Sequence, residues 1–72
     1  MKNNLRSERL ALQWTQTQLA DALGVSRQTV HSIEAGKYIP STLLALKIAC
    51  LLAKQVEEVF RLDPGEQPPG IK

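Results

Sequence analysis

The stretch from Thr15 to Gly24 carries the strongest structural constraint in this 72-residue chain. Thr15 precedes Gln18 by three positions, so each side chain can bond a backbone N–H that the first turn of a helix leaves free. Such a capping box fixes where a helix begins. Gly24 marks the end, because glycine adopts the left-handed backbone of a helix stop without steric cost. The pattern predicts a short helix between these two signals.

A second helix follows after a very short turn. Ser26 is a good N-cap, Val30 and Ile33 fall on one inward face, and Gly36 ends the helix. The outward side chains are polar and almost free of acid, which suits the DNA major groove: arginine can pair with guanine and glutamine with adenine. An ordinary solvated surface is the alternative. The outward set consists of Arg27, Gln28, His31 and Ser32.

This two-helix stretch, residues 15–37, resembles the helix-turn-helix of the phage repressor and Cro family in its compact form. The likeness is carried by the following residues, in chain order: Thr15-Gln16, Gln18-Leu19-Ala20, Leu23-Gly24-Val25-Ser26-Arg27, Thr29, Ile33-Glu34 and Gly36-Lys37. It continues weakly to about residue 62. The resemblance implies an all-α, five-helix bundle of the lambda-repressor-like type with the motif at helices 2 and 3. We expect a DNA-binding domain over 1–62 and a flexible tail over 63–72.

The resemblance also implies roles for individual residues. Arg9 is expected to pair with Glu34, since a planar guanidinium can meet a carboxylate with two hydrogen bonds even when partly buried. Two unrelated surface charges are the alternative. Base contacts are expected from Arg27, Gln28, Thr29, His31 and Ser32, and phosphate contacts from Gln16, Thr17, Ser26, Lys37 and Tyr38.

Two departures from the family pattern stand beside these expectations. Gln13 occupies the place of a helix-ending glycine, so it must either adopt a left-handed backbone at some cost or let the first helix, expected from Asn3 or Asn4 to about Gln13, end differently. Ala35 replaces a common asparagine, which weakens the case for a backbone contact there. Trp14 is interpreted as a core residue rather than a base-stacking platform.

The second half of the chain is strongly apolar. Ser41 is expected to cap a fourth helix in which Lys47 interrupts an apolar run over 43–53, so we expect this helix to be the buried centre of the bundle and to run past Ala53. Its Cys50 is expected in the core. A short fifth helix follows, with a strand over 60–62 suggested beside residues 2–4. We expect a homodimer through Leu51, Leu52, Val56, Val59 and Phe60, the alternative being that these five fill the core of one chain.

The first helix is expected to place Leu5, Arg9 and Leu12 on one face with Leu10 beside it.

The composition of the chain excludes several classes of protein and of binding site. One cysteine and one histidine cannot build a disulfide or a zinc site, and no cofactor motif occurs. No apolar run approaches about 20 residues, and the polar N-terminus does not resemble a signal peptide, so a cytoplasmic, bacterial or phage-derived protein without a membrane segment is expected.

The predicted function is therefore a sequence-specific double-stranded DNA-binding transcriptional regulator. We expect a repressor that acts as a homodimer on a roughly palindromic operator, and not an enzyme, because the sequence shows no nucleophile with its base and no phosphate-binding glycine loop. The alternative is a protein-interaction module, such as an antitoxin that neutralises a partner protein through its apolar C-terminal face. Residues 1–37 hold five basic and three acidic side chains, which is the whole net charge of +2 and lies with the proposed DNA-reading half.

Overall fold

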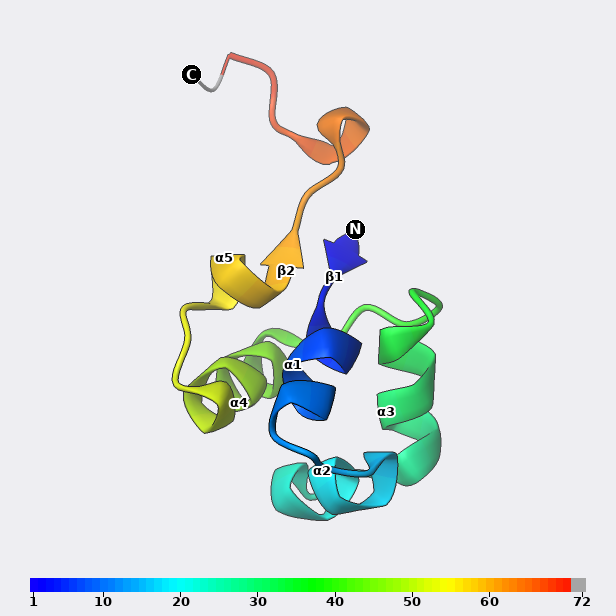
Figure 1. Cartoon of the computed structure of the whole chain (residues 1–72). Coiled ribbons are helices and arrows are strands. Elements are labelled where there is room, and N and C mark those ends of the chain that lie inside the picture. Colours follow the sequence, from blue (N-terminus) through cyan, green and yellow to red (C-terminus); the bar gives the residue numbers. More distant parts are fainter. Residues whose placement is uncertain (71–72) are drawn as a thin grey trace.

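The computed structural model describes residues 1–70 and has the predicted helical bundle with a short strand pair (Figure 1). The α2 helix lies at one end with α3 running from it along the side of the bundle, and the strands and α5 lie toward the other end. In chain order the elements are β1 (Lys2–Asn3), α1 (Leu5–Ala11), α2 (Gln16–Leu23), α3 (Arg27–Glu34), α4 (Thr42–Leu52), α5 (Val56–Val59), β2 (Phe60–Arg61) and the 3-10 turn η1 (Pro64–Glu66).

The predicted cap signals set the helix boundaries. Thr15 and Gln18 form the complete capping box at the start of α2, and Gly24 ends that helix with φ of 73°. Ser26 accepts a hydrogen bond from the Thr29 N–H at the start of α3, and Ser41 does the same for Leu44 in α4. These bonds satisfy backbone donors that have no partner inside their own helix. Local chemistry therefore fixes where three of the helices begin.

The core lies where α1, α2, α3 and α4 converge. Its largest fully buried side chains are contributed by every helix, so no pair of helices could form it alone. Trp14 packs against its edge and is half-buried, as predicted for a core residue. The fully buried set is Leu5, Leu19, Leu23, Val30, Ile33, Ile48 and Val59.

The suggested strand is present. β1 and β2 pair in antiparallel register, with Lys2 opposite Arg61 and Asn3 opposite Phe60. This pairing fastens the end of the domain to its beginning. Asn3 adds a second link, because its side-chain nitrogen donates to the Ile33 carbonyl at 2.9 Å and so reaches the last turn of α3.

The α4 helix differs from the expectation in two ways. It ends at Leu52 rather than running on, because Ala53 takes the left-handed backbone at φ of 55°. It is also not buried on all sides: Leu43 and Leu46 are 69% and 54% exposed, and Cys50 is exposed as well. Because α2 and α5 pack against the other side of α4, these three positions are left outside the core.

Smaller corrections concern the two ends. The α1 helix stops at Ala11, and Leu10 and Leu12 are about half exposed, so Leu12 does not share the buried face of Leu5 and Arg9. Gln13 takes the first of its two alternatives, with φ of 60°. The segment predicted as a flexible tail contains the 3-10 turn η1, and the Met1 amine lies 3.0 Å from the Asp63 carboxylate. The prediction for 71–72 lies outside the described residues.

Within residues 1–70 no helix is long and apolar enough to cross a membrane. The same part of the chain brings no three His, Cys, Asp or Glu side chains into a group that could hold a metal ion.

Candidate nucleic-acid interface

The face of α3 that points away from the core is the candidate interface. Val30 and Ile33 anchor the helix from the other side with no exposed surface. Among the five predicted base-contacting residues, three are exposed and two are half-buried. The exposed three are Arg27, Gln28 and His31, and the half-buried two are Thr29 and Ser32.

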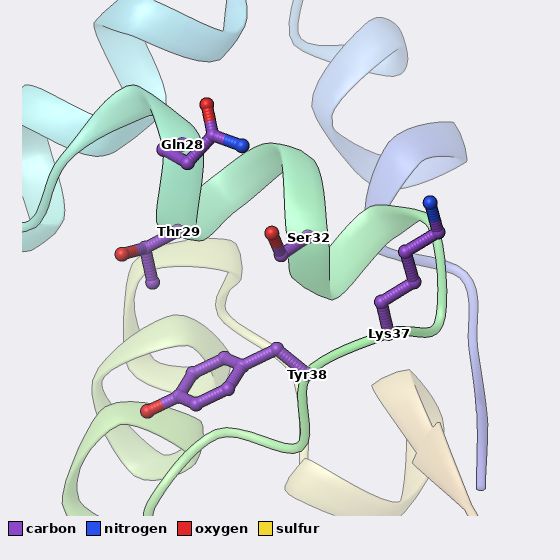
Figure 2. Close-up of a pocket in the computed structure, with 5 residues that line it drawn as sticks. All are labelled: Gln28, Thr29, Ser32, Lys37 and Tyr38. Carbon is purple, nitrogen blue, oxygen red and sulfur yellow. The ribbon is translucent and has the colours of Figure 1, made fainter.

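The half-buried pair lies beside the loop that follows α3. Five residues line a hollow of about 300 Å³ here. Figure 2 shows that Gln28, Thr29 and Ser32 come from α3, and that Lys37 and Tyr38 come from the loop. The Tyr38 ring extends along the side of the helix near Thr29, whereas the Lys37 side chain points away from that ring. Gly36 makes this arrangement possible, because its φ of 75° turns the chain back at the end of α3.

A second hollow lies on the other side of the same helix. It has a volume of about 320 Å³ and is lined by Gln16, Arg27, Gln28 and His31. Gln28 therefore stands between the two hollows, and Gln16 brings the start of α2 to the face of α3. The structure thus collects residues predicted for base contact and residues predicted for phosphate contact on one continuous surface.

The start of α2 presents free backbone donors to this surface. The backbone N–H groups of Gln16 and Thr17 donate to no acceptor among residues 1–70, whereas the Gln18 N–H donates to the Thr15 hydroxyl at 3.0 Å. Unpaired N–H groups and the positive end of the helix dipole favour an anion. Ser26, in contrast, already uses its hydroxyl in the α3 cap and with the Thr29 hydroxyl at 3.0 Å.

The ion pair between Arg9 and Glu34 is present and joins α1 to α3. The Arg9 Nε and Nη2 donate to the two Glu34 oxygens at 2.7 and 3.1 Å, in the two-bond geometry that the resemblance implies. The remaining Arg9 nitrogen donates to the Trp14 carbonyl at 2.7 Å. Arg9 is only 7% exposed, and its three hydrogen bonds link α1 to α3 and to the Trp14 carbonyl. These bonds fix the orientation of α3 relative to α1.

Glu34 also binds the start of α2, since the Gln16 side-chain nitrogen donates to it at 3.1 Å. Burial acts to raise the pKa of Glu34, but the hydrogen bonds from Arg9 and Gln16 and the positive charges of Arg9 and Arg6 outweigh it. The pKa of the carboxyl is therefore lowered from its ordinary value of 4.5, and Glu34 is ionised at neutral pH.

The comparisons with known proteins identify the family of this chain. A family model described as helix-turn-helix matches residues 5–59, which is more than half of the chain. The chain belongs to the helix-turn-helix family. This confirms the predicted family and fold, and it places the protein among the DNA-binding helix-turn-helix transcriptional regulators.

Individual relatives match nearly the full length of this helix-turn-helix protein. An HTH-type transcriptional regulator of Bacillus subtilis is 44% identical over 63 residues, which are 88% of this chain and 96% of the relative. Another HTH-type transcriptional regulator, from Methanocaldococcus jannaschii, is 47% identical over 66 residues, which are 92% of this chain and 100% of the relative. The crystal structure of the restriction-modification controller protein C.AhdI from Aeromonas hydrophila matches with a TM-score of 0.71 and 34% identity, over 78% of this chain and 85% of that one.

The residues predicted for a dimer are divided by the helix-turn-helix fold. Val59 and Phe60 are 1% and 7% exposed, so they fill the core of one chain and offer a partner almost no surface. Leu51, Leu52 and Val56 are half-buried at the core's edge. The larger exposed apolar surface lies nearby at positions that the sequence did not single out, namely Ile39, Leu43 and Leu46.

Sequence reasoning also missed residues that position the helix-turn-helix or extend its surface. Lys47 donates to the Leu23 carbonyl at 3.0 Å and links α4 to the end of α2. The sequence feature that could have predicted this role is that Lys47 is the single charged residue in an apolar helix. Asn3 holds the end of α3, and a polar residue just before α1 gives little hint of that. Arg6, on α1, lines a hollow together with Arg27 and His31.

Proposed function

We propose that this helix-turn-helix protein is a sequence-specific regulator that places α3 in the major groove of double-stranded DNA and represses transcription by occupying promoter DNA. The observation that carries this proposal is the acid-free polar face of α3, on which Gln28 stands between a hollow with Gln16 and a hollow with Lys37. Side chains at the centre can reach base edges, while donors on both flanks can hold the phosphates of the two strands. Such a regulator acts where the DNA lies, which is the cytoplasm in bacteria.

The experiment that tests the proposal is selection of duplex DNA from a random pool by the purified protein. Enrichment of a defined site supports sequence-specific binding, and no enrichment at low salt refutes it. Gln28→Ala should cost about 1 to 3 kcal/mol on the selected site and relax preference at one base position, whereas Lys37→Ala should weaken binding to all duplexes alike. Equal losses on selected and random duplex for Gln28→Ala would refute its role in base reading.

We further propose that two copies bind a roughly palindromic operator as a homodimer. Two α3 helices related by a twofold axis would then enter successive major grooves about 34 Å apart, so the selected site should contain two inverted half-sites one helical turn apart. A single enriched half-site would contradict the dimer and leave the reading helix untouched.

The surface proposed for pairing combines the half-buried Leu51, Leu52 and Val56 with the exposed side chains of α4. Leu46 is 54% exposed and borders a largely apolar hollow of about 230 Å³ that also includes Ile39 and Val56. Exposed apolar groups gathered in this way are typical of protein contact sites.

Leu46→Glu should shift the protein toward monomer in analytical ultracentrifugation, because it would place two carboxylates in the proposed interface. Leu10→Glu is a matched control, since Leu10 is 51% exposed but lies on α1. Equal sedimentation of the two variants would contradict this surface.

A further inference from the structure

The proposed phosphate contact of Gln16 meets a difficulty in the structure. Its side-chain nitrogen donates to Glu34 at 3.1 Å and lies 3.5 Å from the His31 Nδ1. A primary amide has two N–H groups, and the Gln16 nitrogen that carries them already donates to Glu34. The reverse orientation of the amide would set its oxygen against the Glu34 carboxylate, which is electrostatically unfavourable. Glu34 therefore competes with a phosphate for the side-chain donors of Gln16.

Arg6 offers a donor that is free. It is exposed on α1 and forms no hydrogen bond or ion pair with any residue in the range 1–70. It is nevertheless close enough to Glu34 to contribute to the lowered pKa of that carboxyl. The hydrogen bonds that the Glu34 oxygens accept come instead from Arg9 and Gln16. The Arg6 guanidinium thus stands near the α3 surface with all its donors available.

The surroundings of Arg6 form an open hollow of about 500 Å³ between α1, α2 and α3. Its lining includes Gln16, Arg27 and His31, three of the four residues that line the neighbouring hollow on the face of α3. The charge of Arg9 is balanced by Glu34 inside this hollow, whereas the charges of Arg6 and Arg27 are not balanced by any ion pair within residues 1–70. The hollow is therefore cationic and continuous with the proposed reading surface.

We propose that Arg6 binds a backbone phosphate of the DNA strand that crosses this hollow, so that the DNA contact of the protein extends onto α1. A guanidinium can give a phosphate two parallel hydrogen bonds, and this geometry compensates for the engaged side chain of Gln16. The Gln16 and Thr17 backbone N–H groups lie at the start of α2 and can bind the same strand. This inference rests on the proposed function, because it needs α3 in the major groove.

The test compares Arg6→Ala with Arg61→Ala. Both variants remove one positive charge, but Arg61 is exposed on β2, at the end of the molecule away from α2 (Figure 1). Affinity for the selected site and for random duplex is measured over a series of salt concentrations. Arg6→Ala should weaken binding to both duplexes by the same factor and reduce the slope of log K against log salt by about 0.9 for each bound protomer. Arg61→Ala should leave the slope unchanged.

Other outcomes separate this inference from the proposed function. Equal slopes for Arg6→Ala and Arg61→Ala would overturn the phosphate contact while leaving sequence-specific binding intact. A changed base preference in Arg6→Ala would also overturn it, because a phosphate contact carries no sequence information. Arg6→Lys should keep the slope of log K against log salt but lose part of the affinity. Lysine retains the positive charge but cannot form the two parallel hydrogen bonds of a guanidinium. If the unaltered protein binds no duplex, the proposed function fails instead.

Discussion

Replacing Glu34 with alanine is expected to destabilise the protein strongly, because it breaks the buried ion pair with Arg9. The change leaves the Arg9 guanidinium 7% exposed with one remaining bond, to the Trp14 carbonyl at 2.7 Å. It also removes the acceptor of the Gln16 side chain. Removing one partner of a buried ion pair costs about 3–5 kcal/mol, because the other charge stays buried without compensation. We expect a loss near the lower end, about 3 kcal/mol, because the Trp14 carbonyl continues to bind Arg9.

This loss is large for so small a protein. A chain of 72 residues has a total unfolding free energy of roughly 4–11 kcal/mol at the usual stability per residue. A loss of about 3 kcal/mol should lower the melting temperature by about 12–24 °C at this size. Thermal and urea unfolding followed by circular dichroism would measure both quantities on the same sample.

Glu8→Ala is the matched control. Glu8 pairs with Lys54 at 3.4 Å, but the Lys54 side chain is 37% exposed and that of Glu8 is 21% exposed, so the pair is accessible to water. Exposed pairs of this kind contribute about 0–1 kcal/mol. The reasoning would be refuted if Glu34→Ala and Glu8→Ala melted within a few degrees of each other. An Arg9→Met and Glu34→Leu double variant should recover much of the loss, because it buries no unpaired charge.

The remaining predictions concern pH, backbone strain and the thiol. Because the pKa of Glu34 is lowered in the folded protein, its ionised carboxylate stabilises the fold above pH 4.5, and this contribution is lost as the pH falls through the folded-state pKa. The difference in unfolding free energy between the unaltered protein and Glu34→Gln should therefore shrink below about pH 4.5. A difference that does not change with pH would contradict the Arg9–Glu34 ion pair. Gln13→Gly and Ala53→Gly should each raise the melting temperature by up to about 4–8 °C. Glycine removes the steric cost of a left-handed backbone, about 1–2 kcal/mol, and loses about half of that gain through the greater entropy of the unfolded chain. A lower melting temperature would show that the backbone at these positions is not strained. Cys50 should react with a chromogenic disulfide reagent in the native protein, and reaction only after unfolding would contradict its exposure.

Several features of the fold were predictable because their causes are local in sequence. The caps at Thr15, Ser26 and Ser41 act on backbone groups within three residues, and Gly24 ends a helix through its own conformational freedom. The inward positions of α3 follow from helical spacing alone. The Arg9–Glu34 pair was different, since 25 positions separate the two residues and only the family resemblance connected them.

The sequence by itself determined where the helices of the DNA-reading unit begin and end and which face of α3 is polar, because these properties depend on neighbouring residues and on helical periodicity. Tertiary structure decided how many sides of α4 are covered, and therefore that Leu43, Leu46 and Cys50 are exposed while Val59 and Phe60 are buried. It also decided that the Gln16 side chain binds Glu34 and that Arg6 remains free beside α3. An apolar side chain has the same preference for burial in every sequence, but whether it is satisfied depends on which neighbours reach it in space.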